Sequence, residues 1–127
     1  MADREKPLIL TVDDVPENID VIKGILTPTY TVSAAINGKL ALKIAEVQQP
    51  DVILLDVMMP EMDGHEVCRR LKSNEATKDI PVIFVTALGD GDDEREGLEL
   101  GAADYVTKPI SPQVLKEKIS AHLDWDG

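Results

Sequence analysis

The sequence of 127 residues contains one cysteine, few basic residues and no long apolar run. Its single cysteine, Cys68, cannot form a disulfide within the chain, which favours a reducing compartment. No apolar run reaches the ~18 residues of a membrane helix, and Met1–Pro7 is charged rather than signal-like. Lysine and arginine number 13 against 24 acids, a net charge of −11, whereas phosphate binding needs clustered basic residues. We therefore expect a cytoplasmic protein that binds neither membranes nor nucleic acid directly.

The apolar residues that are present suffice for one packed domain. They make up 43% of the chain, close to the ~45–50% of ordinary globular domains. No internal repeat, low-complexity segment or linker divides the sequence. We expect a single domain over residues 1–127, with its core between residues 7 and 123.

Five β-type runs alternate with five amphipathic stretches. The runs are Leu8–Val12, Tyr30–Ala34, Val52–Leu55, Val82–Val85 and Ala103–Thr107. Three of them are continuously apolar, which is typical of parallel strands buried on both faces. Apolar residues recur at helical spacing in Pro16–Leu26, Asn37–Val47, Gly64–Leu71, Asp92–Leu100 and Ser111–Leu123. The alternation predicts an α/β fold with a doubly wound, five-stranded parallel sheet and five helices.

Helical periodicity also predicts which side chains face the core. We expect Leu40 on the second helix and Val114 and His122 on the last to point inward, with His122 hydrogen-bonded within the core. Cys68 is expected to be a small, buried hydrophobic residue. Gly97 is expected to weaken the fourth helix, because glycine is a poor helix former.

Polar side chains stand at the carboxyl ends of four predicted strands. Asp13 and Asp14 follow the first strand, and Asp56, Thr86 and Lys108 follow the third, fourth and fifth. Ligands of open α/β sheets bind outside these strand ends. A pair of like charges ~4 Å apart repels by roughly 4 kcal/mol at an effective dielectric constant of about 20, and one lysine offsets only part of this. The cluster therefore predicts a site for Mg²⁺ or Mn²⁺ rather than zinc. The alternative, that these acids only cap solvated strand ends, stays open.

Beside such a cation, the Asp56 carboxylate is placed to attack an electrophilic phosphorus and form an aspartyl phosphate. The Lys108 ammonium would neutralise charge on the phosphoryl oxygens. The Thr86 hydroxyl would donate a hydrogen bond to one of them. The residues at the strand ends thus predict phosphoryl chemistry.

Four motifs resemble the receiver domain of two-component response regulators, over nearly the whole chain. They are VDDVPEN after the first strand, DVILLDVMMPEMDG around Asp56, PVIFVTA at Thr86 and GAADYVTKPI at Lys108. The resemblance implies a (βα)5, flavodoxin-like fold. It also implies a signalling switch and not a turnover enzyme, because a receiver catalyses only its own phosphorylation and dephosphorylation.

The resemblance implies a role for each residue of the cluster. Asp56 would accept the phosphoryl group, and Lys108 would contact it. Asp13, Asp14 and Asp56 would bind Mg²⁺ together with the backbone carbonyl of Met58. Of the acidic pair, Asp14 resembles the direct ligand and Asp13 a ligand that acts through water.

A conformational switch is implied as well. Phosphorylation would draw Thr86 toward the new oxygens, and the Tyr105 ring would fill the vacated space. The movement would bias the face built from the fourth helix, the fifth strand and the fifth helix. The resemblance further implies a cis peptide bond between Lys108 and Pro109.

The implied phosphodonor is a sensor histidine kinase or a histidine phosphotransfer protein. An output domain, attached or separate, and a homodimer that forms on phosphorylation are both left open. The motifs are similar to those of receivers attached to cyclic-di-GMP enzymes or hybrid kinases, so the chain is either a single-domain regulator or the receiver of a longer one. Two other classes remain. An aspartyl phosphohydrolase would have the pattern DxD at its nucleophile, whereas this chain has Met58 in place of the second acid. A degenerate receiver used only for docking would lack a key residue.

Overall fold

The computed structural model describes residues 6–86 and 91–123, and of residues 91–94 only the backbone. Strands and helices alternate in the order β1 Leu8–Val12, α1 Pro16–Leu26, β2 Thr31–Ala35, α2 Gly38–Gln48, β3 Val52–Asp56, α3 Gly64–Lys72, β4 Val82–Thr86, α4 Gly91–Glu99, β5 Asp104–Thr107 and α5 Pro112–His122. The strands form one parallel sheet of order β2-β1-β3-β4-β5. The predicted doubly wound α/β fold is confirmed.

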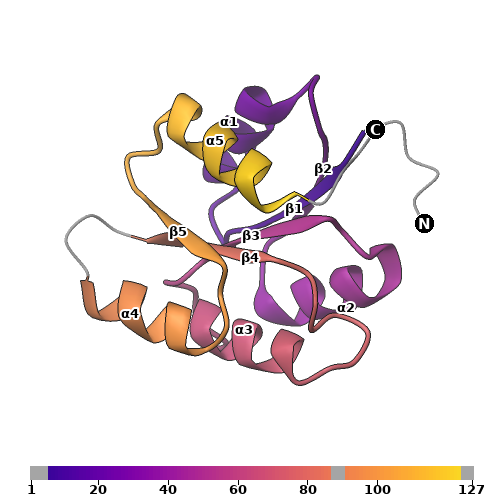
Figure 1. Cartoon of the computed structure of the whole chain (residues 1–127), viewed down its shortest axis with the longest axis vertical. Coiled ribbons are helices and arrows are strands. Elements are labelled where there is room, and N and C mark those ends of the chain that lie inside the picture. The colour runs from indigo at the N-terminus through magenta and orange to yellow at the C-terminus, as the bar shows by residue number, and fades with distance from the viewer. Residues whose placement is uncertain (1–5, 87–90, 124–127) are drawn as a thin grey trace.

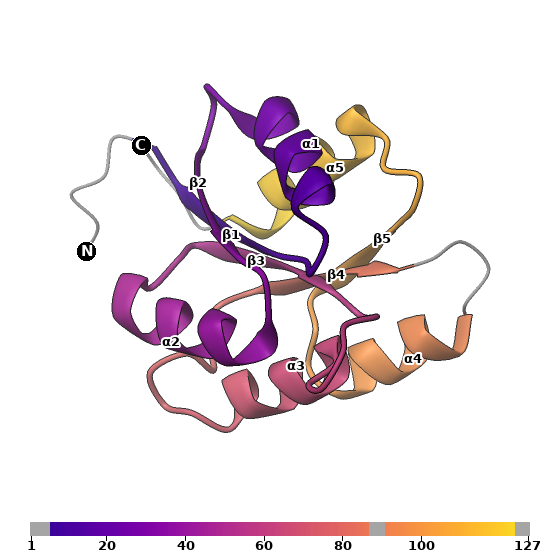
Figure 2. The ribbon, with the colours of Figure 1, turned by 180° about the vertical axis from the view of Figure 1, so that it is seen from behind.

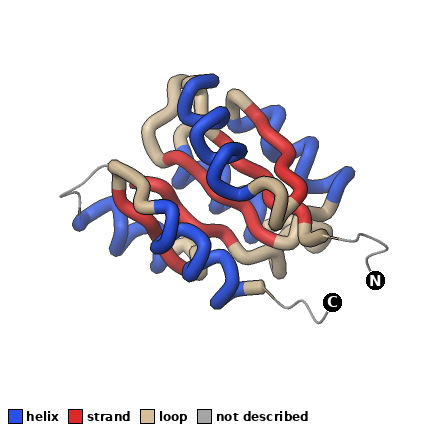
Figure 3. Tube along the Cα trace, turned by 90° about the horizontal axis from the view of Figure 1, so that it is seen from above, coloured by secondary structure: helices blue, strands red, loops and turns tan. Residues whose placement is uncertain are grey.

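Helices cover both faces of the sheet. The pair α1 and α5 lies on one face, and α2, α3 and α4 lie on the other (Figure 1). Figure 2 shows these layers from behind, and Figure 3 shows them from above. Because successive side chains of a strand point to opposite faces, every position of the central strands is buried: Ile9 and Leu54 pack under α1 and α5, and Leu10 and Ile53 pack on the other side. This two-sided burial explains the continuously apolar runs.

Short polar side chains begin three of the helices. The Asn37 carboxamide accepts a hydrogen bond from the Leu40 amide, and the Asp63 carboxylate accepts one from the Glu66 amide. The Ser111 hydroxyl caps α5 in the same way, as its position before Pro112 suggests. Such caps satisfy amides that the helix itself leaves unpaired. They fix the points at which α2, α3 and α5 begin beside the strand ends.

None of the helices in the described ranges is long and apolar enough to span a lipid bilayer.

Three burial predictions are wrong. Leu40 and Val114 are each 40% exposed. The buried stripe of α2 runs through its alanines, and that of α5 runs through Leu115 and Ile119. Leu40 and Val114 therefore lie next to the buried stripes of their helices and not within them. His122 lies in the last turn of α5, partly exposed, and bonds Asp104 rather than the core. Cys68 is fully buried, as predicted.

Glu61, in the β3–α3 loop, has a φ of 68°, in the left-handed region. This conformation costs a residue with a side chain about 1–2 kcal/mol, whereas glycine adopts it freely but loses about 0.5–1 kcal/mol more backbone entropy on folding. We expect Glu61→Gly to raise the free energy of unfolding by roughly 0.5–1 kcal/mol, measured by urea denaturation. The matched exchange Glu117→Gly, inside α5, should lower it by about 1 kcal/mol. Losses of equal size in both variants would contradict the assignment of strain to Glu61.

Candidate functional site

Three carboxylates meet at the carboxyl edge of the sheet. Asp13 and Asp14 directly follow β1, and Asp56 is the last residue of β3. One oxygen from each of the three lies within 4.8 Å of the others. Asp13 and Asp56 are only 3% and 5% exposed, and Asp14 is the most open to solvent. The structure therefore brings together the three acids that the sequence predicted to converge.

Two neighbours in the α1 region orient Asp13. The Val15 amide donates to Oδ1 at 2.9 Å, and the Asn18 side-chain amide donates to Oδ2 at 3.1 Å. Asn18 was missed in the sequence, although it belongs to the VDDVPEN motif. Its place in the first turns of α1, one loop after Asp13, was the available signal.

The Lys108 ammonium lies opposite the acids. It is 3.6 Å from Asp56 Oδ1 and 3.7 Å from Asp13 Oδ2. The Lys108 amide donates to the Thr86 carbonyl at 2.8 Å, which ties the β5–α5 loop to the end of β4. The Lys108–Pro109 bond is cis, as the resemblance implied. The Lys108 ammonium thus faces the cluster of carboxylates.

The charge balance at Asp56 is unfavourable. Burial, and next to it the negative charge of Asp13, raise the pKa of Asp56 from 3.8 to about 6. The Lys108 ammonium and a hydrogen bond from the Met58 backbone N–H lower the pKa, but less than the other effects raise it. A compact all-oxygen cluster with too little positive charge fits a hard divalent cation such as Mg²⁺. The backbone of Met58 lies at the site, while the ligand role of its carbonyl stays a prediction.

Thr86 lies at the end of β4, next to Val85, which pairs with Asp56 across the sheet. It is 1% exposed. Among the residues that the structure describes, its Oγ1 has no hydrogen-bond partner. A buried hydroxyl without a hydrogen-bond partner lowers the free energy of unfolding by about 1–3 kcal/mol. The Thr86 hydroxyl is therefore a donor available to a ligand that brings acceptor oxygens.

Gly64, the first residue of α3, packs directly against the end of β3. Its amide donates to the Val57 carbonyl at 2.9 Å. A Cβ atom on Gly64 would lie 2.3 Å from the Asp56 carbonyl oxygen, so a larger residue would push α3 away from the site. This residue too was missed, because the contact joins the start of α3 to the end of β3, which only the fold brings together.

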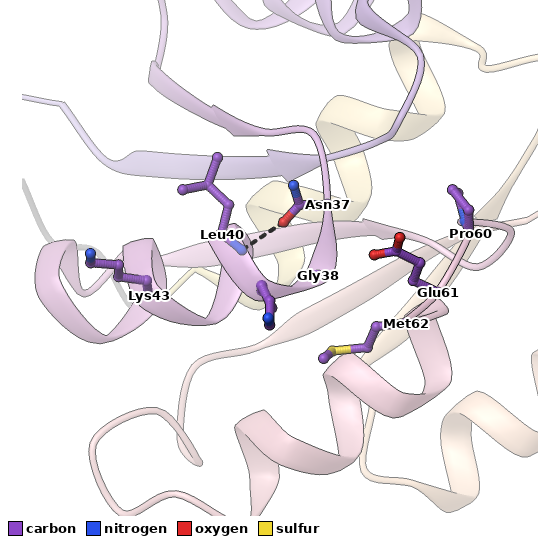
Figure 4. A pocket seen from close by; sticks show the side chains of 8 residues that line it. Asn37, Gly38, Leu40, Lys43, Pro60, Glu61 and Met62 are labelled. Carbon is purple, nitrogen blue, oxygen red and sulfur yellow. Dashed lines mark hydrogen bonds between the residues drawn. The ribbon is translucent and has the colours of Figure 1, made fainter.

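A cavity of about 480 Å³ lies between the start of α2 and the β3–α3 loop (Figure 4). Its walls are the first turns of α2, including Leu40 and Lys43, and the β3–α3 loop, including Glu61 and Met62. None of the three clustered acids lines it. The three carboxylates that we assign to the functional site therefore lie outside this cavity.

The chain is thus an open parallel α/β sheet that gathers acids, a lysine and a buried threonine hydroxyl at its strand ends, an acidic site typical of those that bind a divalent cation. Residues 9–120 match the family model of the response regulator receiver domain. The chain belongs to this family, and the resemblance seen in its motifs is confirmed.

The curated relatives that the chain resembles are longer than the chain. The chain is 46% identical over 123 residues to a Vibrio cholerae protein named a probable cyclic di-GMP phosphodiesterase, a match that covers 97% of this chain and 28% of that protein. It is 47% identical over 112 residues to response regulator PleD of Caulobacter vibrioides, covering 87% and 25%. The chain thus spans about a quarter of the length of these curated relatives.

Solved structures share the fold. The receiver domain of sensor histidine kinase PA1611 from Pseudomonas aeruginosa, which holds a magnesium ion in its active-site cleft, superposes with a TM-score of 0.85 at 31% identity, over 92% of this chain and 97% of that one. Chemotaxis protein CheY4 of Vibrio cholerae gives 0.87 at 28% identity, over 93% and 99%.

Proposed function

We propose that this receiver domain accepts a phosphoryl group on Asp56 from the phosphohistidine of a sensor histidine kinase or a histidine phosphotransfer protein. The observation that carries the proposal is the convergence of Asp13, Asp14 and Asp56, with the Lys108 ammonium 3.6 Å from Asp56. The domain is then a signalling switch that acts on itself and turns over no metabolite.

Asp13, Asp14 and Asp56 would hold a Mg²⁺ ion, with the Met58 carbonyl as a further ligand. Mn²⁺, which also accepts hard oxygen ligands, could substitute. The oxygen-only donor set and the raised pKa of Asp56 support this assignment. When bound, the ion supplies positive charge that neutralises the carboxylates and the phosphoryl oxygens.

In the proposed transfer, an Asp56 carboxylate oxygen attacks the phosphorus. A P–O bond forms, the P–N bond to the donor imidazole breaks, and its electron pair returns to the imidazole nitrogen. Lys108 neutralises charge on the transferred group, and the Thr86 hydroxyl donates to one of its oxygens. The hydrogen bond from the Lys108 amide to the Thr86 carbonyl joins the backbones of these two residues to each other.

The proposed output is a change in the face formed by α4, β5 and α5. The bond from Thr86 to the phosphoryl group would draw its side chain toward Asp56, and the Tyr105 ring would follow. Because one relative is named a probable cyclic di-GMP phosphodiesterase and the match covers only 28% of its length, we propose that this face controls an output domain, attached or separate. A homodimer that forms on phosphorylation would use the same face.

The test is the intact mass of the protein after incubation with acetyl phosphate, with Mg²⁺ or with EDTA. We expect one phosphoryl adduct with Mg²⁺ and none with EDTA, and peptide mapping should place it on Asp56. No adduct while Mg²⁺ still raises the unfolding temperature would contradict phosphoryl transfer and favour a docking module. Steady phosphate release over many turnovers would favour a hydrolase.

A further inference from the structure

A cluster of side chains joins β5 to α5 away from the acidic site. Lys118 Nζ lies 2.9 Å from Asp104 Oδ1, and His122 Nε2 lies 3.1 Å from Asp104 Oδ2. Burial raises the pKa of Asp104, but hydrogen bonds from Lys118, the Tyr105 amide and His122 outweigh it, so this pKa lies below its usual value. Asp104 is therefore a carboxylate that fixes the end of the Lys118 side chain.

The Lys118 ammonium also lies over the Tyr105 ring, 5.2 Å from its centroid. Tyr105 packs against the core on the side of α2, α3 and α4, whereas its neighbour Val106 packs on the side of α1 and α5. Since β5 is an edge strand, Lys118 reaches around that edge from α5. The ring is thus held at the edge of the sheet by a cation from the opposite face.

We propose that Lys118, anchored by Asp104, is a positioning residue that holds the Tyr105 ring at the sheet edge and opposes its movement toward Thr86. The inference rests on the proposed function, in which that movement accompanies phosphorylation. A ring that moves toward Thr86 leaves the ammonium, so the cation–π attraction favours the arrangement seen here. Loss of the Lys118 charge therefore shifts the equilibrium toward the switched arrangement.

The decisive variant is Lys118→Met, which keeps an unbranched stem and removes the charge. An exposed cation–π contact corresponds to about a two- to fivefold change in a two-state equilibrium. We expect the rate constant for phosphorylation by acetyl phosphate, at saturating Mg²⁺, to rise about two- to fivefold. Lys118→Arg, which keeps a cation at this position, should have the wild-type rate. Lys116→Met, on an exposed part of the same helix, makes the same charge change and should leave the rate unaltered.

A double variant separates positioning of the ring from a general effect on α5. In a Tyr105→Leu background there is no ring to hold, so Lys118→Met should no longer change the rate. An equal rate in wild type and Lys118→Met overturns the proposal. So does the same increase in the Tyr105→Leu background, because the lysine would then act without the ring.

A second readout does not depend on phosphorylation. With both tyrosines replaced by 3-fluorotyrosine, the ¹⁹F resonance at position 105 should move in Lys118→Met, and that at the buried Tyr30 should stay in place as an internal reference. If wild type takes no phosphoryl group, the proposed function fails, and this resonance decides the inference alone. A position-105 resonance that is the same in both proteins overturns it.

Discussion

Replacing Asp56 with asparagine is expected to abolish the phosphoryl adduct formed from acetyl phosphate and Mg²⁺. The carboxamide has nearly the size of the carboxylate but lacks its nucleophilic oxygen. The Lys108 ammonium, 3.6 Å from Asp56 Oδ1, remains to bind the donor's phosphoryl group, so the variant keeps the setting and loses the attacking atom. Intact mass after incubation measures the loss directly.

Asp20→Asn is the matched control. Asp20 is exposed on α1, and its replacement makes the same change in charge and volume away from the strand ends. We expect its adduct to form as in wild type. An unchanged yield in Asp56→Asn would mean that another residue accepts the phosphoryl group and that the proposed role of Asp56 is wrong.

The fold could be predicted because its determinants are local in the sequence. The runs over β1, β3 and β4 are mostly apolar, and the structure buries them at every position, because helices cover both faces of the sheet. Pro16, Ser111 and Pro112 mark helix starts that the structure has at the same places. The acidic site followed from the same pattern, since parallel strands end at one edge and Asp13 and Asp56 stand at those ends.

Contacts between distant residues could not be predicted in this way. Gly97 looked like a weakness in its helix, but a Cβ atom there would lie 2.6 Å from Phe84 Cδ2, so glycine lets α4 pack closely on β4. The contact of Lys118 with Tyr105 joins two elements around a sheet edge, and no spacing in the sequence encodes it. Helical periodicity likewise predicts the position of the buried stripe of α5 but not its width. This is why the prediction that Val114 points into the core is wrong.

The stability of the wild type in EDTA is expected to fall as the pH rises through the range in which Asp56 ionises. The pKa of Asp56 in the folded protein is about 6, above its ordinary 3.8, so the folded state binds this proton more tightly than the unfolded state. A raised carboxyl pKa contributes stability that is fully present below about pH 3.8 and is lost as the pH rises through about 6. The difference between these two pKa values corresponds to about 3 kcal/mol in the free energy of unfolding.

Asp56→Asn isolates this effect because it lacks the titrating group. Its free energy of unfolding in urea should equal that of wild type at pH ~3 and exceed it by about 3 kcal/mol at pH ~7. Asp20→Asn should follow the wild-type curve. Parallel curves for wild type and Asp56→Asn would show that Asp56 is not destabilised by ionisation in the folded state.

Added Mg²⁺ should reduce the difference in free energy of unfolding between Asp56→Asn and wild type at pH ~7. An ion that binds only the folded site stabilises wild type more than a variant with one ligand fewer. The burial of Asp56 and the nearby charge of Asp13 that destabilise the metal-free fold are then the features that favour cation binding. A pocket with its charges already balanced would be more stable but would attract a cation less. The predicted instability in EDTA is therefore a direct consequence of the proposed function.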